Sequence, residues 1–303
     1  MLYVIIILLT AFFSAAFIGA GFFLSSTVIR PEKYTIQSAW DCDVSLGKID
    51  PVSYAALPKE EVYIPSYDGK KIYGVFIPCG SSQKTVIILH GVTFTFAGSI
   101  KYMHMFLNRG FNVLMIDHRA HGRSEGTFVT FGYREKHDVS AAIDFLENRF
   151  GPHCYTGILA ESMGGAIALQ HAAVDSRARF IIEDSSFSNL HQLLSYQIKK
   201  TYNLPAFPFI NIAALFIRLR SGMQIKDISP VNAVKKITVP VLFIHGGADD
   251  LVPTSMAQEL YDAKAGEKEI YIADGSIHAD SFWAHREEYD RRVGAFLKRI
   301  GAV

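Results

Sequence analysis

The sequence predicts an α/β fold in which a mostly parallel central sheet is flanked by helices and preceded by a hydrophobic N-terminal helix. Three observations support this prediction. Short continuous apolar segments of strand length recur from residue 71 onward, and segments with helical periodicity separate them. No charged residue occurs from Leu2 to Ile29. Regular alternation of strands and helices is typical of a parallel sheet with helices on both faces.

Seven segments are predicted as strands. The first, residues 71–78, is expected to be an early antiparallel strand. The other six are short continuous apolar runs, as expected of strands that are buried on both faces: residues 85–89, 113–116, 156–159, 180–182, 241–244 and 269–272. Helical periodicity occurs in residues 135–150 and in residues 289–300, where apolar side chains recur at i, i+4, i+7, i+8 and i+11.

The 303-residue chain is long enough for one large α/β domain, which we assign to residues 61–303. Residues 30–60 are interpreted as a linker and lead-in, because prolines recur there as helix breakers. About fifty residues between Ser186 and Lys236 contain no clear strand. Because a structureless loop of that length is unusual in a compact domain, we predict a helical cap insertion at about residues 187–236.

The uncharged N-terminal segment is interpreted as a transmembrane anchor at residues 1–29. It exceeds the roughly 20 apolar residues that a helix needs to cross a bilayer. A cleaved signal peptide is the competing interpretation: small residues permit cleavage, but no Lys or Arg precedes the apolar run. Arg30, Lys33 and Lys48 all follow the segment. The positive-inside rule therefore predicts a single-pass membrane protein with a cytoplasmic domain.

Composition argues against several classes of function. The formal net charge is +1 and no basic stripe is present, so nucleic acid is not expected as a partner. The three cysteines have neither the paired spacing of a disulfide framework nor the spacing of zinc ligands. Neither a metal ion nor an organic cofactor is predicted.

The sharpest local signal is the segment AESMGG at residues 160–165, which follows a predicted strand and precedes a helical pattern. This is the context of a nucleophile elbow, in which a serine, here Ser162, stands on a tight strand-to-helix turn. Small neighbours such as Gly164 are required because the turn brings the two backbones close together. The motif departs from G-x-S-x-G at Ala160. A plain helix-capping turn is the alternative interpretation.

A serine hydroxyl is a weak nucleophile by itself, so an acid and a base are also needed. We assign the acid to Asp249, which follows the strand predicted at residues 241–244 and is expected at the same edge of the sheet as Ser162. Its neighbour Asp250 is interpreted as solvated or helix-capping. Asp184, which follows another predicted strand, is the alternative position for the acid.

The base follows from the order of the residues along the chain, which on such a fold is serine, acid and then histidine. Of the eleven histidines, only His278 and His285 follow Asp249. We assign the base to His278, because it lies in a loop after the last predicted strand. His285 lies within a charged helix, where a solvated histidine is the ordinary expectation.

Backbone N–H groups are expected to stabilise the oxyanion that forms during acyl transfer. The predicted donors are the N–H of Met163, which follows the serine, and the N–H of Val92 in the loop after residues 85–89. We interpret His90 as a structural residue that holds this loop. The polar segment at residues 117–126 is interpreted as a hydrogen-bonded loop at the pocket rim, with a metal or phosphate site as the alternative.

Together these motifs resemble the α/β-hydrolase family over residues 60–300. The matching segments, in the order of that family, are HGV at 90–92, DHRAHGRSEG at 117–126, AESMGG at 160–165, HGGADDLVP at 245–253 and SIHADS at 276–281. The arrangement looks most similar to bacterial membrane-anchored serine hydrolases with one N-terminal span. The resemblance implies a catalytic triad of Ser162, Asp249 and His278, and a cap between the sixth and seventh core strands.

The predicted function is that of a serine hydrolase that cleaves small-molecule carboxylic esters, including lipophilic ones, through an acyl-enzyme intermediate. Apolar residues of the insertion are interpreted as a roof over an acyl pocket. Two other interpretations are equally good, namely the core of the cap itself and a surface that lies on the bilayer. These residues are Leu204, Phe207, Phe209, Ile210, Leu215 and Phe216. Two alternatives stay open, namely a peptidase or acyl-peptide hydrolase with the same triad, and a non-catalytic membrane-anchored binding protein.

Overall fold

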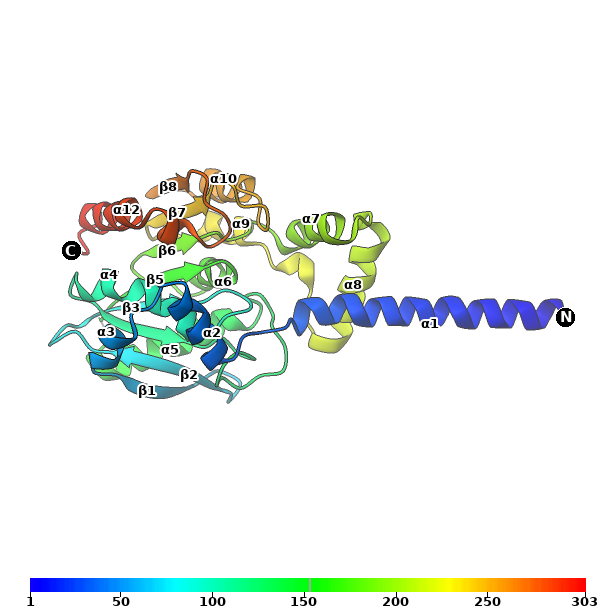
Figure 1. Ribbon diagram of the computed structural model, residues 1–303, viewed down its shortest axis with the longest axis horizontal. Coiled ribbons are helices and arrows are strands. Elements are labelled where there is room, and N and C mark those ends of the chain that lie inside the picture. Colours follow the sequence, from blue (N-terminus) through cyan, green and yellow to red (C-terminus); the bar gives the residue numbers. More distant parts are fainter. Residues whose placement is uncertain (153) are drawn as a thin grey trace.

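The computed structural model describes residues 1–152 and 154–303, and its centre is one eight-stranded sheet with the order β1-β2-β4-β3-β5-β6-β7-β8 (Figure 1). β2 pairs antiparallel with both β1 and β4, whereas the other neighbouring strands are parallel. The strands are β1 Glu60–Pro65, β2 Lys71–Ile77, β3 Lys84–Leu89, β4 Asn112–Ile116, β5 Tyr155–Glu161, β6 Ile181–Asp184, β7 Val241–Gly246 and β8 Lys268–Ala273.

Helices cover both faces of this sheet. Residues of α5, α6 and α10 belong to the hydrophobic core on one face, and residues of α2, α4 and α12 to the core on the other. The α-helices are α1 Leu2–Ile29, α2 Ile36–Ser45, α3 Pro51–Ala56, α4 Met103–Leu107, α5 Glu135–Phe150, α6 Met163–Ala172, α7 Leu190–Tyr202, α8 Ala206–Ser221, α9 Pro230–Ala233, α10 Ser255–Ala263, α11 Ser281–Ala284 and α12 Arg286–Arg299. Three short 3₁₀ helices are η1 Phe96–Tyr102, η2 Ile225–Asp227 and η3 Val234–Lys236.

The central strands are apolar along their whole length because both of their faces are covered. In β3, Ile87 and Leu89 point into the core beneath α5 and α6, whereas Val86 and Ile88 point into the core beneath α4 and α12. All four side chains are completely buried. This arrangement explains why the strands appear in the sequence as continuous apolar runs rather than as an alternation of apolar and polar residues.

The observed sheet confirms the predicted fold class, and each of the seven predicted strands is present. β1 was not predicted. It is an edge strand in which only Val62 and Ile64 are buried, so its sequence, EEVYIP, carries too few apolar residues to stand out. The lead-in contains two short helices, and Pro51 begins α3 rather than interrupting it. A proline at the first helical position is favourable because its missing N–H would have no intrahelical partner.

The segment between β6 and β7 contains α7, α8, η2, α9 and η3. α7 and α8 are bent by 119° relative to one another at the short break between them. Figure 1 shows α7 running away from the sheet and α8 returning beside α1. The regular structure of this segment is therefore helical, and it lies at the end of the domain from which α1 projects.

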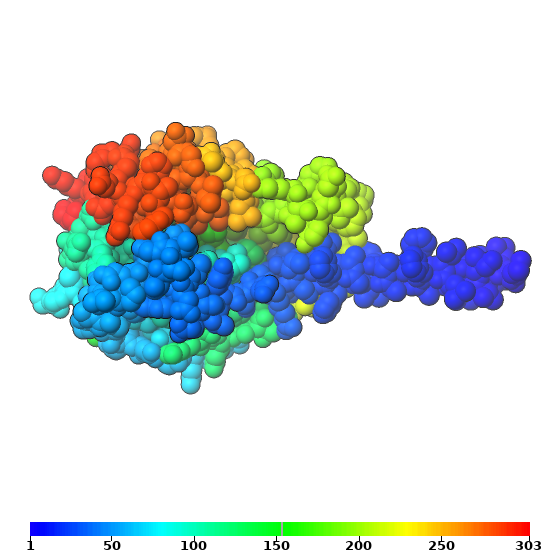
Figure 2. Space-filling model, in the orientation of Figure 1, coloured from blue at the N-terminus to red at the C-terminus, as the bar shows by residue number. Residues whose placement is uncertain are grey.

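The N-terminal helix α1 has two parts with different surroundings. Figure 2 shows its first part projecting from the domain, and residues 1–19 are exposed. Leu24, Val28 and Ile29 are buried against the domain, and the Ile29 carbonyl oxygen accepts a hydrogen bond from Val129 N–H at 3.0 Å. By length and composition α1 could cross a membrane or serve as a signal sequence.

Candidate active site

Ser162 stands in a strained turn between β5 and α6. Its backbone has φ +55° and ψ −118°, a region that residues other than glycine rarely adopt. The Ser162 N–H donates a hydrogen bond to the Asp184 carbonyl oxygen at 2.7 Å, which holds the turn against β6. A Cβ atom at Gly164 would lie 2.6 Å from the Leu89 carbonyl oxygen. The turn therefore requires glycine at this position, whereas the buried methyl group of Ala160 is accommodated.

The structure brings Ser162, His278 and Asp249 together, although they come from three different parts of the chain. His278 Nε2 lies 2.9 Å from Ser162 Oγ, and His278 Nδ1 lies 2.7 Å from Asp249 Oδ2. The three residues follow β5, β7 and β8, whose carboxyl ends share one edge of the sheet. With its proton on Nδ1, His278 donates to the carboxylate and leaves Nε2 free to accept from the serine hydroxyl.

The Asp249 carboxylate is held in its ionised form. The N–H groups of Leu251 and Val252 donate to Oδ1 at 3.0 and 2.9 Å. Burial acts to raise the pKa of Asp249, but the imidazoles of His245 and His278 and the Val252 N–H stabilise the charge and hold the pKa well below its ordinary value. An ionised carboxylate in this position can fix the orientation of the imidazole.

The alternative acids and the alternative base lie elsewhere. Asp184 is buried against Tyr102 and Ser185, and burial together with the Glu161 charge raises its pKa to about 6. Asp250 is 80% exposed and forms an ion pair with Lys200 at 2.6 Å. His285 is on the surface beside the Asp274 carbonyl oxygen. Asp249 and His278 are thus the acid and histidine that accompany Ser162.

Comparisons with known proteins identify the family of this chain. The uncharacterized protein YqkD of Bacillus subtilis is 36% identical over 287 residues, which cover 94% of each chain. A hydrolase family model described as serine aminopeptidase, S33, matches residues 80–199. The chain belongs to the α/β-hydrolase family. The Pyrococcus furiosus esterase Pf2001 superimposes on this hydrolase with a TM-score of 0.69 at 28% identity, over 83% of this chain and 94% of that one.

Another solved structure extends the likeness in fold. Est1E of Butyrivibrio proteoclasticus, solved with ferulic acid bound, has a TM-score of 0.65 at 20% identity and covers 80% of the hydrolase and 100% of its own chain. Among sequence relatives, the uncharacterized protein YfhR of Escherichia coli K12 is 29% identical over 249 residues, which cover 78% of this chain and 80% of YfhR. The first likeness is one of fold, and neither names a substrate for this chain.

The predicted oxyanion donors, Met163 and Val92, line the same cavity as Ser162 and His278. A Cβ atom at Gly91 would lie 3.4 Å from Ser162 Cβ, so the loop that carries Val92 passes close to the serine. Within the part of the chain that the structure describes, neither N–H donates to a protein acceptor. Both groups are therefore available to a substrate oxygen, and their role stays a prediction.

The polar loop at residues 117–126 is held by hydrogen bonds among its own residues and their neighbours. His121 Nε2 lies 2.6 Å from the Val92 carbonyl oxygen, and His90 Nε2 accepts from His118 N–H at 3.0 Å. Burial lowers the pKa of His118 to about 3 and of His121 to about 4, so both are neutral. Among residues 1–152 and 154–303, no cluster of His, Cys, Asp or Glu has the geometry to hold a metal ion.

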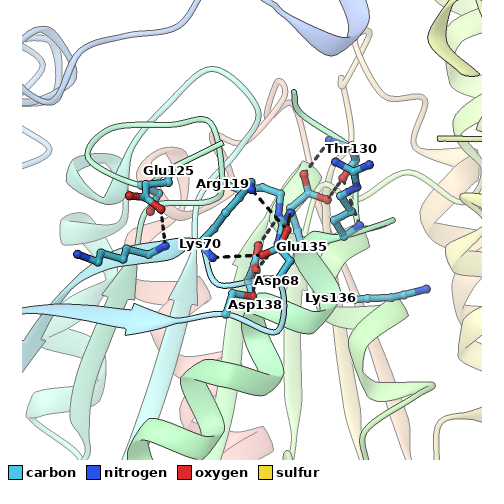
Figure 3. Close-up of polar contacts among 12 residues, drawn as sticks. Asp68, Lys70, Arg119, Glu125, Thr130, Glu135, Lys136 and Asp138 are labelled. Carbon is cyan, nitrogen blue, oxygen red and sulfur yellow. Dashed lines mark hydrogen bonds and ion pairs between the residues drawn. The ribbon is translucent and has the colours of Figure 1, made fainter. Parts of the chain in front are cut away.

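A buried ion-pair network fixes the base of this loop (Figure 3). The Arg119 guanidinium donates to both oxygens of Asp138 at 2.7 and 2.6 Å and to Asp68 at 3.1 Å. Glu135 accepts from the N–H and hydroxyl of Thr130 at 2.7 and 2.6 Å. The loop is therefore anchored to α5 and to the turn between β1 and β2, which agrees with its interpretation as a hydrogen-bonded structural loop. Its place at the pocket rim stays a prediction.

The cavity at Ser162 has a volume of about 230 Å³ and is mostly apolar. Of the apolar residues of the insertion predicted as a roof, Ile210 lines it. Phe207 is 75% exposed, and Phe216 packs on Gly21 of α1. Sequence reasoning missed the contribution of α1 to this cavity, because a helix that is apolar on all sides gives no indication of which side chains face the domain. The described residues that line the cavity are Leu24, Thr27, Val28, Pro31, Val92, Phe131, Ser162, Met163, Phe187, Leu193, Leu194, Gln197, Ile198, Thr201, Tyr202, Ile210, Ala213, Leu251, Val252 and His278.

Proposed function

We propose that this hydrolase is a membrane-anchored serine esterase in which Ser162, His278 and Asp249 form the catalytic triad. The observation that carries the proposal is the continuous chain of contacts from Asp249 through His278 to the Ser162 hydroxyl, at the wall of an apolar cavity. A nucleophile, a base and an orienting acid at these distances are the elements that acyl transfer requires.

In the proposed mechanism His278 Nε2 accepts the Ser162 proton while Oγ forms a bond to the ester carbonyl carbon. The N–H groups of Met163 and Val92 stabilise the resulting oxyanion. The tetrahedral intermediate collapses, the leaving alcohol takes the proton from His278, and an acyl-serine remains. Water, deprotonated by His278, then attacks the acyl group, and the carboxylic acid leaves as Ser162 regains its proton. Asp249 stabilises the imidazolium at both stages.

The cavity supports an ester rather than a peptide as substrate. Among the described residues that line it, none is Asp, Glu, Lys or Arg. An aminopeptidase needs a group that binds a terminal ammonium, and a carboxylate is the ordinary choice. The apolar lining instead favours an apolar acyl group, because such a group gains free energy from leaving water.

The N-terminal helix supports a retained anchor. One face of the last turns of α1 is buried against the domain, so cleavage behind this helix would remove part of the cavity wall. In the proposed topology α1 crosses the bilayer once, and Arg30, Lys33 and Lys48 keep the catalytic domain on the cytoplasmic side.

Covalent labelling of the detergent-solubilised protein by a short-chain fluorophosphonate tests the triad. We expect wild type to label, Ser162→Ala not to label, and His278→Ala to label at least roughly 10³-fold more slowly. Ser195→Ala and His285→Ala are matched controls, since neither residue lines the cavity, and both should label like wild type. Aryl esters and aminoacyl amides assayed side by side separate an esterase from a peptidase. A wild-type protein that neither labels nor hydrolyses an ester would favour the binding-protein alternative.

A further inference from the structure

One wall of the cavity at Ser162 is built from the N-terminal helix. Leu24, Thr27 and Val28 of α1 line the same cavity as the serine and His278. The facing wall comes from α7 and α8 and includes Leu193, Leu194, Ile198, Ile210 and Ala213. The helix that is proposed to cross the bilayer therefore also forms part of the substrate site.

Close packing fixes α1 in this position. The Phe216 ring of α8 lies so close to Gly21 that a Cβ atom there would sit 2.3 Å from the ring. Arg220 donates to the hydroxyls of Ser25 and Ser26 at 2.6 and 2.8 Å, and its guanidinium lies over the Phe22 ring. These contacts leave α1 little freedom to move relative to α8, so the cavity wall is a stable feature of the site.

The cavity begins where a membrane span would end. A helix rises about 1.5 Å per residue, so roughly 20 residues cross the hydrocarbon region, and a span that starts at Leu2 ends near Gly21. Leu24 and Val28 follow directly, on the side of the domain. Arg220 lies beside Ser25 and Ser26 at this boundary, where a long cationic side chain can reach the headgroup layer.

α8 crosses α1 with its N-terminal end on the side away from the domain, toward the proposed membrane (Figure 1). Phe216 contacts Phe17 and Gly21, about one turn nearer the N-terminus of α1 than the serines that Arg220 contacts. Phe207 and Leu219 expose most of their apolar surface on the same helix. α7 leads from the sheet toward this end of the molecule (Figure 1), and its last residues, Thr201 and Tyr202, also line the cavity. The cavity thus extends from Ser162 toward the side on which the bilayer would lie.

The volume of the cavity limits what it can accept. At about 230 Å³ it is smaller than the roughly 300–1,000 Å³ of most ligand pockets. An apolar space of this size suits one acyl chain better than the two chains of a diacyl lipid. No charged residue among the described lining residues competes for the polar end of the substrate, so the ester group is placed by Ser162 and the oxyanion donors.

We infer that the hydrolase takes a single-chain acyl ester directly from the membrane, between α1 and α7, and that Leu24 and Val28 set the length of the chain. This inference rests on the proposed esterase function, to which it adds the source of the substrate and the residues that select it. The N-terminal helix then serves both as an anchor and as a part of the acyl-binding wall.

Chain-length profiles of the full-length protein in phospholipid vesicles test the role of Leu24. The measured quantity is the ratio of kcat/KM for an aryl dodecanoate to kcat/KM for the matching acetate. Leu24→Trp fills the cavity and should lower this ratio by roughly 15-fold, as expected if about two methylene groups lose their contacts. Ile18→Trp is the matched control on the lipid-exposed side of α1, where the native side chain is 57% exposed, and the ratio should not change.

The outcomes separate this inference from the esterase proposal. If Leu24→Trp labels with the fluorophosphonate and cleaves the acetate but keeps the wild-type ratio, α1 does not select the chain and the inference is wrong, while the esterase proposal stands. If wild type cleaves neither ester, both fail. Leu24→Ala is a second variant for the case in which the larger Trp side chain prevents folding. It enlarges the cavity and should raise kcat/KM for an aryl palmitate relative to kcat/KM for the dodecanoate.

A second measurement tests entry from the bilayer. An aryl palmitate is incorporated either into the vesicles that carry the protein or into separate vesicles of the same composition. Hydrolysis should be faster in the shared vesicles, because the ester diffuses laterally to the cavity. Equal initial rates in the two arrangements would mean that the ester arrives through water, which overturns entry between α1 and α7.

Discussion

The Nε2 atom of His245 lies 3.2 Å from Oδ2 of Asp249, the carboxylate oxygen that also faces His278 Nδ1 at 2.7 Å. The same His245 nitrogen lies 2.9 Å from the Val252 carbonyl oxygen. With a proton on Nε2, His245 donates toward both acceptors and provides a second contact to the Asp249 oxygen that faces His278. In the proposed mechanism His245 is therefore a positioning residue that acts through Asp249.

Replacement of His245 should lower activity without weakening substrate binding. We expect His245→Ala to reduce kcat by about tenfold, the effect of removing a hydrogen bond to a charged group, with little change in KM because His245 does not line the cavity. His245→Gln keeps an N–H donor and should restore part of kcat. His285→Ala serves as the surface control. Equal losses in the Ala and Gln variants would mean that His245 acts by packing alone.

Asp249 should matter far more than its neighbour in sequence. Asp249→Asn replaces the carboxylate with an amide that cannot stabilise the imidazolium, and we expect kcat to fall by about 10³–10⁴-fold. Asp250→Asn alters an exposed ion pair with Lys200 and should change kcat by less than about twofold. Ester hydrolysis by both purified variants checks the prediction. A small effect at Asp249 would return Asp184 to consideration as the acid.

Gly164 should tolerate no side chain. Gly164→Ala places a Cβ atom 2.6 Å from the Leu89 carbonyl oxygen, a backbone atom that cannot move aside easily. We expect a loss of about 1–3 kcal/mol in the free energy of unfolding and a marked loss of fluorophosphonate labelling. Gly19→Ala is a suitable control, since open space surrounds that position. Thermal unfolding in detergent measures the stability. Normal labelling by Gly164→Ala would show that the turn is less constrained than its contacts indicate.

The sequence predicted most of the domain because its signals are local. Buried parallel strands must be apolar on both faces, so runs such as residues 85–89 are recognisable without knowledge of their partners. The turn at Ser162 has a short motif because its backbone geometry permits only small neighbours such as Gly164. Asp249 and His278 could be assigned from their positions after strands, since strand ends of a parallel sheet share one edge.

The features that escaped prediction depend on contacts between distant segments. Nothing in the uniformly apolar sequence of α1 distinguishes Leu24 and Val28 from the residues that face outward. Their burial is decided by α7 and α8, nearly two hundred residues away in the chain. The second contact of Asp249, with His245, was also missed, because a histidine that directly follows a predicted strand is indistinguishable from an ordinary core residue until its partner is known.

Arg119 should be critical for stability although it lies outside the cavity. It is buried and is the partner of Asp138, whose pKa is raised by burial although the Arg119 guanidinium acts to lower it. Arg119→Met removes the positive charge beside that carboxyl and leaves only the Ser66 hydroxyl as its donor among the described residues, and we expect a loss of about 3–5 kcal/mol in the free energy of unfolding. Arg123→Met, which breaks an exposed pair with Glu61, should cost less than about 1 kcal/mol. Adding Asp138→Leu to Arg119→Met should recover part of the loss; no recovery would contradict the ion-pair explanation.

Glu183 should make the folded state less stable as the pH rises. Burial raises its pKa to about 8, far above its ordinary value, so the folded state holds a proton that the unfolded state releases above about pH 4.5. Stability from this group is therefore greatest below pH 4.5 and is lost as the pH rises to about 8. Glu183→Gln removes the titration. The thermal midpoint of this variant should match that of wild type near pH 5 and exceed it at pH 9. The higher midpoint at pH 9 corresponds to a difference on the order of 2–5 kcal/mol in the free energy of unfolding. Glu267→Gln, on the surface, should follow wild type throughout. Parallel profiles for wild type and Glu183→Gln would show that this carboxyl is ionised in the folded protein.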